Sequence, residues 1–77
     1  MWIRSQDRDK LINLDTVKTI FMTITNFRYE IKADDITLGV YTSKNNAIDT
    51  LAYIHECIYL GKNEMFMPLE KDGELLK

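Results

Sequence analysis

The chain has 77 residues, 45% of them hydrophobic and 29% charged, which is typical of one small globular domain and argues against a disordered chain. Ten basic and twelve acidic residues give a net charge of -2, so the chain lacks the excess positive charge that favours binding to a nucleic-acid backbone. A single cysteine excludes an internal disulfide, and no stretch approaches the roughly 20 apolar residues that span a bilayer. Because no signal-peptide pattern opens the chain, we expect a cytoplasmic protein that does not enter a membrane.

Two short apolar segments begin the chain and are separated by charged residues. Trp2 to Gln6 is predicted to be a strand, residues 7–10 a turn, and Leu11 to Leu14 the strand that returns. Aspartate is favoured in such turns, because its carboxylate accepts hydrogen bonds from nearby backbone N–H groups. The pattern therefore predicts an N-terminal β-hairpin.

Three further strands are predicted at residues 18–24, 27–33 and 36–41, where apolar residues alternate with polar ones. With Thr25-Asn26 and Asp34-Asp35 as two-residue turns, the register places apolar residues opposite one another on one face. The expected pairs are Ile24 with Phe27, Met22 with Tyr29, Ile20 with Ile31, Ala33 with Ile36, Ile31 with Leu38 and Tyr29 with Val40. Two separate turns agree on the same face, which predicts an antiparallel meander.

A helix is predicted after the last of these strands, because the apolar spacing changes from two residues to three and four. Thr42 or Ser43 can cap its first turn with a hydroxyl oxygen, and Gly61 is placed just after its last turn. An apolar stripe on this helix is expected to lie on the sheet: Ala47, Ile48, Leu51, Ile54 and Ile58. Residues 64–67 follow as a short strand, which ends at Pro68 because proline has no N–H to donate.

These elements predict an α+β fold, in which an antiparallel β-meander of about five strands has one helix packed on one face and a short C-terminal edge strand. A single domain is expected over residues 1–70, and a flexible tail over residues 71–77. A domain of this size has one small core, and self-association is a common way to add to it.

Several segments form recognisable motifs: Met1-Trp-Ile-Arg-Ser-Gln-Asp7, Leu38-Gly-x-Tyr41 followed by Ser43-Lys44, Ala47-x-x-x-Leu51 and Met67-Pro68. Over most of residues 1–70 they resemble short uncharacterised proteins of Gram-positive bacteria and their phages. The resemblance implies a phage or mobile-element origin and the same fold, but those proteins have no established activity. Their helix often starts with an acidic residue that favours the helix N-terminus, whereas this chain has Asn45-Asn46.

Chemically reactive residues are few. His55 is the only histidine, and the helical wheel places it at the edge of the apolar stripe, where a structural role is expected. Cys57 cannot pair with it within this helix, because residues i and i+2 do not face each other. Asp7-x-Asp9 lacks the third oxygen ligand, the glycine and the glutamate of a calcium loop. We therefore expect no enzyme activity, no metal and no cofactor.

Aromatic and charged residues gather on the sheet face that points away from the predicted helix. Trp, Tyr and Arg are enriched at binding hot spots, and Gly39 is expected to leave an indentation opposite Glu30. A solvated sheet face with ordinary aromatic residues would explain the same pattern. The binding surface predicted here consists of Trp2, Arg4, Phe21, Arg28, Glu30 and Tyr41. A second surface, for self-association, is predicted on the helix at Tyr53, Tyr59 and Leu60.

The predicted function is a non-catalytic binding module that contacts a protein partner through the open sheet face and forms a homodimer. One alternative is the binding or sequestering of a small anionic ligand such as a nucleotide. In that case Arg4 and Arg28 would hold the phosphate, and Trp2 or Tyr41 would stack on the base. The other alternative is weak binding of single-stranded nucleic acid through the same aromatic residues, which Glu30 and the negative net charge disfavour.

Overall fold

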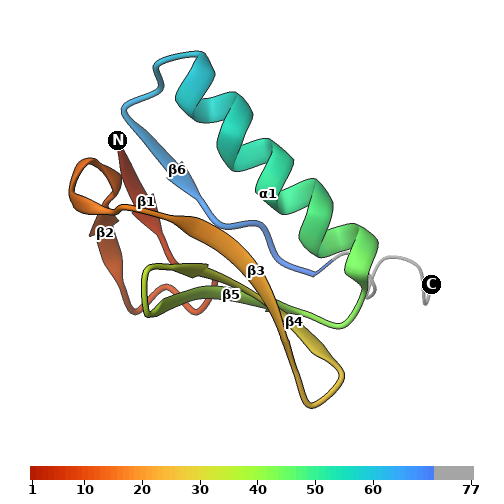
Figure 1. The fold of residues 1–77 in the computed structure, drawn as a ribbon. Coiled ribbons are helices and arrows are strands. Elements are labelled where there is room, and N and C mark those ends of the chain that lie inside the picture. Colours follow the sequence, from red (N-terminus) through yellow and green to blue (C-terminus); the bar gives the residue numbers. More distant parts are fainter. Residues whose placement is uncertain (71–77) are drawn as a thin grey trace.

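The computed structural model describes residues 1–70, and the tail expected over residues 71–77 lies outside the described residues. Within residues 1–70 the chain forms six short strands, one 3-10 helix and one α-helix (Figure 1). Their bounds are β1 (Trp2–Arg4), β2 (Leu11–Asn13), η1 (Leu14–Thr16), β3 (Ile20–Thr25), β4 (Arg28–Ala33), β5 (Ile36–Tyr41), α1 (Lys44–Tyr59) and β6 (Glu64–Phe66). Neither helix in this part of the chain is long and apolar enough to cross a membrane.

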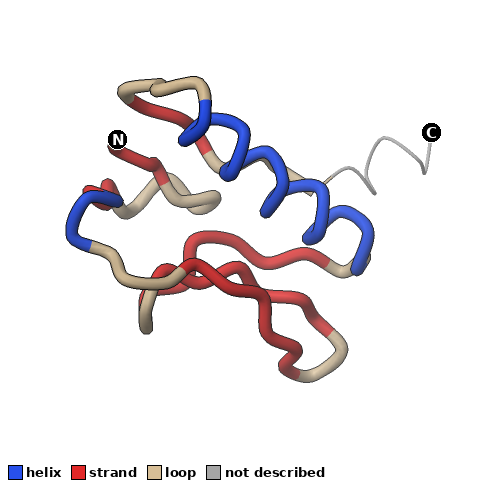
Figure 2. Tube along the Cα trace, turned by 45° about the horizontal axis from the view of Figure 1, so that its top comes forward, coloured by secondary structure: helices blue, strands red, loops and turns tan. Residues whose placement is uncertain are grey.

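The described strands form two three-stranded sheets, and Figure 2 shows α1 lying to one side of the long strands. In the first sheet, β1 pairs antiparallel with β2 and parallel with β6. In the second sheet, β3, β4 and β5 form an antiparallel meander, and α1 packs against all three strands. The predicted α+β fold with a meander under one helix is confirmed. The N-terminal hairpin, however, belongs to a separate sheet, in which β6 is an edge strand.

The turn between β3 and β4 lies one residue later than expected. Asn26 and Phe27 form it with positive φ angles of 50° and 62°, which is the backbone of a type I′ hairpin turn. The pairs therefore move by two residues, so that Ile24 lies opposite Tyr29. The predicted pairs were wrong, but the predicted faces were right, because an even shift leaves every side chain on the same face.

A β-bulge interrupts the pairing of β4 with β5, and Leu38 is the extra residue. Beyond a bulge the alternation of side chains is reversed. Tyr41 therefore turns into the core, where it is 1% exposed, and its predicted place on the open face is wrong. The indentation expected at Gly39 is also absent, because an added Cβ there would lie 3.2 Å from both Met67 and Tyr41.

Both ends of α1 agree with the predicted caps. The Ser43 hydroxyl oxygen accepts a hydrogen bond from the Asn46 backbone N–H at 3.3 Å. At the other end Gly61 has a φ of +70°, and its N–H and that of the next residue donate to the carbonyls of Ile58 and Cys57 at 3.1 and 3.0 Å. These two bonds form a Schellman motif, in which glycine tolerates the left-handed backbone.

The acidic residue missing from the first turn of α1 is supplied from the other end of the described chain. One carboxylate oxygen of Glu70 accepts hydrogen bonds from the Thr42 backbone N–H and, at 3.0 Å, from its hydroxyl. The other oxygen accepts from the Asn46 side-chain amide at 2.7 Å. A carboxylate at this position interacts favourably with the helix dipole, so Glu70 takes the role that the Asn45-Asn46 start cannot fill.

The face of α1 that enters the core is rotated from the predicted stripe. Ile48 and Ile58 were expected in the core but are 44% and 51% exposed, and Leu51 is partly buried. The Thr50 hydroxyl donates to the Asn46 carbonyl at 2.8 Å, so this polar side chain is satisfied within the helix and can be buried. The buried residues of α1 are Ala47, Thr50, Ile54 and Cys57.

Gln6 links the two sheets. Its backbone N–H donates to the Leu38 carbonyl at 2.7 Å, and its side-chain oxygen accepts from the Val40 N–H at 2.9 Å. Its side-chain amide also donates to the Pro68 carbonyl at 3.3 Å. Gln6 therefore covers the edge of β5 beside the bulge, and it joins that edge to the segment after β6.

Candidate interaction surface

The residues predicted to form one binding surface lie in three separate places. Trp2 and Arg4 lie on the outer face of the first sheet, whereas Phe21, Arg28 and Glu30 lie on the outer face of the second sheet. Trp2 and Phe21 are exposed, as expected, but Tyr41 is buried. The structure therefore does not bring the predicted set together.

Phe66 is the centre of a surface that includes two residues of the predicted set, Trp2 and Arg4. In the first sheet the inner face is buried at Ile3, Ile12 and Met65. Alternate residues of the same strands point outward, since side chains in a strand alternate between its two faces. These outward residues include Trp2, Arg4, Leu11 and Phe66, and the Phe66 ring is 50% exposed.

Two guanidinium groups lie over the Phe66 ring. The Arg4 group is 5.7 Å and the Arg8 group 5.1 Å from the ring centroid, which is within range of a cation–π interaction of about 0.5–1 kcal/mol at an exposed site. Arg4 lies beside Phe66 in the β1–β6 pairing, and Arg8 comes from the turn after β1, where its φ is +69°. We call this set the Phe66 surface: Trp2, Arg4, Arg8, Leu11 and Phe66.

A cleft of about 350 Å³ adjoins the Phe66 surface, between the N-terminal half of α1 and the segment that follows β6. Its apolar lining includes Tyr53, Phe66 and Leu69, while Asn46 and Asp49 are among its polar lining residues. Because Phe66 belongs both to the cleft and to the surface, the two form one continuous region. An apolar hollow with a few polar groups at its edge is the usual form of a ligand or side-chain pocket.

Tyr41 forms part of the wall of this cleft. Its hydroxyl donates to the Pro68 carbonyl at 2.7 Å, which holds the segment after β6 beside β5. Burial raises the pKa of the Tyr41 phenol above its ordinary value, so the hydroxyl keeps the proton that this hydrogen bond requires. Tyr41 is thus a structural residue of the cleft instead of the exposed stacking residue that was expected.

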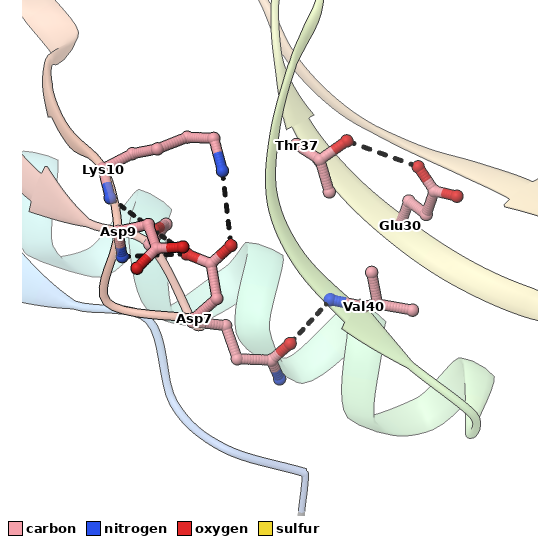
Figure 3. Close-up of polar contacts among 8 residues, drawn as sticks. Asp7, Asp9, Lys10, Glu30, Thr37 and Val40 are labelled. Atoms are coloured by element: carbon pink, nitrogen blue, oxygen red, sulfur yellow. Dashed lines mark hydrogen bonds and ion pairs between the residues drawn. The ribbon is translucent and has the colours of Figure 1, made fainter.

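The Asp7 carboxylate is fully used in its own turn, as Figure 3 shows for Asp7, Asp9 and Lys10. One oxygen accepts from the Ser5 hydroxyl at 2.5 Å and from the Asp9 N–H at 3.0 Å, and the other pairs with the Lys10 ammonium at 3.3 Å. The Ser5 bond first, and then the Asp9 and Lys10 contacts, lower the pKa of Asp7 to about 2. Residues 1–70 contain no group of three or more His, Cys, Asp or Glu side chains arranged to hold a metal ion.

The remaining polar or reactive candidates lie apart from one another: Glu30 is on β4, and His55 and Cys57 are on α1. Glu30 accepts a hydrogen bond from the Thr37 hydroxyl at 3.5 Å, which is visible in Figure 3. His55 is exposed on α1, so its expected place at the core edge is wrong. Cys57 is buried as a free thiol, and the two side chains lie on different faces of the helix.

The residues predicted for self-association, Tyr53, Tyr59 and Leu60, are all exposed. Tyr53 lies on the flank of α1 that lines the cleft, whereas Tyr59 and Leu60 lie in and just after the last turn. Tyr53 therefore lies in the region around Phe66, whereas Tyr59 and Leu60 lie at the C-terminal end of α1.

Phe66, Arg8 and Leu11 were absent from the predicted surface. Residues 64–67 were predicted to form a short strand, but nothing in that segment identified β1 as its parallel partner. Arg8 and Leu11 were assigned to a turn and a returning strand, without a neighbour for either side chain.

No protein-family model, curated protein or solved structure matches this chain.

Proposed function

We propose that this chain is a non-catalytic binding module that contacts a protein partner through the Phe66 surface and the adjoining cleft. The observation that carries the proposal is the half-exposed Phe66 ring, which lies under Arg4 and Arg8 and opens onto the cleft. Aromatic and arginine residues contribute most to binding at protein interfaces, particularly beside a pocket that excludes water. Exposed apolar side chains that lie together beside a cleft are also typical of an interaction site.

The chemistry of this region defines the partner segment that it would accept. An apolar side chain of the partner can enter the cleft between Tyr53 and Leu69, where its burial contributes roughly 1.5–3 kcal/mol. Acidic side chains next to it can pair with Arg4 and Arg8, whose guanidinium groups suit carboxylates. The proposed ligand is therefore a segment with an apolar anchor followed or preceded by acidic residues.

Selection from a displayed peptide library tests this proposal. Peptides with an apolar anchor beside acidic residues should be enriched, and Phe66→Ala should weaken their binding at least about tenfold, which corresponds to about 1.4 kcal/mol. Phe27→Ala is the matched control, because Phe27 is 95% exposed but lies in the β3–β4 turn, outside the Phe66 surface. Selected peptides that bind wild type and Phe66→Ala equally well would contradict the proposal.

The nucleotide alternative has less support, because its contact residues are separated. Arg4 lies in the first sheet and Arg28 at the start of β4 in the second sheet, and Tyr41 is buried. Trp2 and Arg4 lie together on the Phe66 surface, but the full set of proposed phosphate and base contacts does not share one site. The single-stranded nucleic-acid alternative depends on the same separated residues and on a chain with a net charge of -2.

The proposal also includes self-association as a homodimer and a cytoplasmic location. A domain with one small core often gains stability by burying exposed apolar surface against a second copy. The exposed apolar residues of α1 and β3 support this part of the proposal. A free, buried Cys57 suits the reducing cytoplasm.

A further inference from the structure

The outer edge of β3 is open to pairing. β3 is the edge strand of the second sheet and pairs with β4 alone within residues 1–70. In a two-residue hairpin turn, the residues that flank the turn, here Thr25 and Arg28, exchange backbone hydrogen bonds. The backbone groups of residues 21, 23 and 25 therefore point to β4. Those of residues 20, 22 and 24 point away from β4, toward the open edge of the sheet, where described residues give them no partner.

β3 also lacks the features that usually prevent an edge strand from pairing. Charged residues, prolines and bulges are the common protections of an edge, but β3 has the sequence Ile-Phe-Met-Thr-Ile-Thr and a regular register with β4. The opposite edge of this sheet is different, because Gln6 bonds to the backbone of β5 there. β2 and β6, the edges of the first sheet, are only three residues long.

The side of α1 that lies above β3 can be identified from the cleft. Asn46 and Tyr53 line the cleft together with Phe66, so their flank of the helix faces β6. In the second sheet β5 is the strand next to the segment after β6, because a Cβ on Gly39 would lie 3.2 Å from Met67. β3 is two strands away from β5, so the opposite flank of α1 lies on the β3 side.

That opposite flank carries apolar side chains, with the exposed Lys44 and His55 among them on the helical wheel. It carries Ile48, Leu51 and Ile58, of which Ile48 and Ile58 are exposed and Leu51 is partly buried. The same face of β3 below it carries Ile20 and Met22, both partly buried, and an exposed Ile24. Apolar side chains of α1 and of β3 thus border the open edge of β3.

We propose that β3 pairs antiparallel with β3 of a second copy of this chain, about a two-fold axis at Met22. Ile20 then lies opposite Ile24 of the second copy, and Met22 opposite Met22 of the second copy. The outward backbone groups of residues 20, 22 and 24 meet each other in this register and form about six hydrogen bonds between the chains. The two meanders become one continuous sheet, which covers the exposed edge and brings the apolar flanks of both helices to the seam.

A second copy fits this edge better than an unrelated strand. The pairing is self-complementary, and no charged residue lies within β3 to repel its own copy. On the other face of the sheet, Phe21 lies beside Thr23 of the second copy, so the exposed Phe21 ring is covered as well. Each chain offers only one open edge of the meander, because Gln6 covers the other, and the assembly therefore closes as a dimer.

Sedimentation velocity at high micromolar concentration tests the interface. The wild type should sediment as a dimer, and Ile24→Pro should sediment as a monomer, because the N–H that it removes points outward and is not used by β4. Ile24→Lys, at an exposed position, should have the same effect by placing a charge on the edge without changing the backbone. Phe27→Ser is the control and should stay dimeric, since it removes an exposed apolar side chain next to β3 but outside its edge.

Disulfide trapping tests the register, in a Cys57→Ala background. Met22→Cys should form a covalent dimer on oxidation, because hydrogen-bonded partners in an antiparallel pair have Cα atoms about 5.5 Å apart, within disulfide range. Thr25→Cys should not, because its two copies would lie roughly 20 Å apart in the same register. Equal trapping at both positions would overturn the proposed axis.

The inference rests on the proposed self-association and gives it an interface, but it is independent of the Phe66 surface, which lies on the other sheet. A wild type that stays monomeric would overturn both the self-association and the β3 interface. A dimer that survives Ile24→Pro and Ile24→Lys but is lost in the Tyr59→Ser/Leu60→Ser double variant would overturn the β3 interface alone, and would move the contact to the end of α1.

Discussion

At the scale of single residues, Asp7 shows how one side chain can shape a turn. Its carboxylate accepts from the Ser5 hydroxyl and the Asp9 N–H and pairs with Lys10. The Ser5 hydroxyl in turn accepts from the Lys10 backbone N–H at 3.0 Å. Ser5 is buried although it is polar, and these two hydrogen bonds account for its burial.

The lowered pKa of Asp7 predicts a stability contribution with a defined pH range. The group has a pKa of about 2 in the folded chain against an ordinary value of 3.8. Its ionised form is favoured by folding, so the contribution is present above the ordinary pKa and is lost as the pH falls through the folded pKa. Urea unfolding of wild type and Asp7→Asn should differ by a constant amount above about pH 5 and converge between about pH 4 and 2. A difference that stays constant down to pH 2 would show that the Asp7 charge has no such role.

At the scale of secondary-structure elements, the helix caps and the faces of β3 and β4 were predicted correctly, because each depends on residues close together in the sequence. The Ser43 cap and the Gly61 Schellman motif follow from residues within one turn of each helix end. The faces of β3 and β4 followed from simple alternation, even though Phe27 occupies the turn. The bulge at Leu38 was missed, although a glycine inside a strand, here Gly39, is a common sign of a bulge.

The rotation of α1 was not predictable from apolar spacing alone. The wheel counted Ile48 and Ile58 as core residues because they are hydrophobic, and left Thr50 outside because it is polar. In the structure the Thr50 hydroxyl is satisfied by the Asn46 carbonyl, so its burial carries no unpaired group. The exposed Ile48 and Ile58 then lie on the β3 side of the helix, where the proposed second copy would cover them.

The capping of α1 by Glu70 predicts a measurable effect at the element scale. Glu70→Gln keeps the length of the side chain but removes the charge beside the helix N-terminus. It should lower the free energy of unfolding by about 0.3–1 kcal/mol at low salt and by less at high salt, since the interaction with the helix dipole is screened. Glu64→Gln is the control, because Glu64 lies on β6, away from the helix start. Equal losses in both variants would contradict a capping role for Glu70.

At the scale of the whole molecule, the contacts that sequence reasoning missed are those that join distant segments. β6 pairs parallel with β1 across more than sixty residues of chain, and neither strand carries a local feature that identifies the other. The same is true of Tyr41 with Pro68 and of Glu70 with Thr42. These contacts decide where the cleft and the Phe66 surface lie, so the candidate site was less predictable than the fold class.

Gln6 provides the last prediction, because it is the residue through which the first sheet meets the edge of the second. Gln6→Ala removes the acceptor of the Val40 N–H and the donor to the Pro68 carbonyl. The loss should cost about 1–3 kcal/mol of unfolding free energy, since groups at a partly buried edge lose their partners. Hydrogen exchange at the Val40 amide should also become faster, because the edge of β5 can open locally without global unfolding.

Gln6→Glu separates the two bonds. Its carboxylate can still accept from the Val40 N–H but cannot donate to the Pro68 carbonyl, so exchange at Val40 should stay slow while part of the stability is lost. Exchange at Ile24, whose N–H lies on the open edge of β3, should be the same in both variants when the chain is monomeric. If Val40 exchanges equally slowly in wild type and Gln6→Ala, its N–H is protected by the sheet itself, and Gln6 does not close this edge.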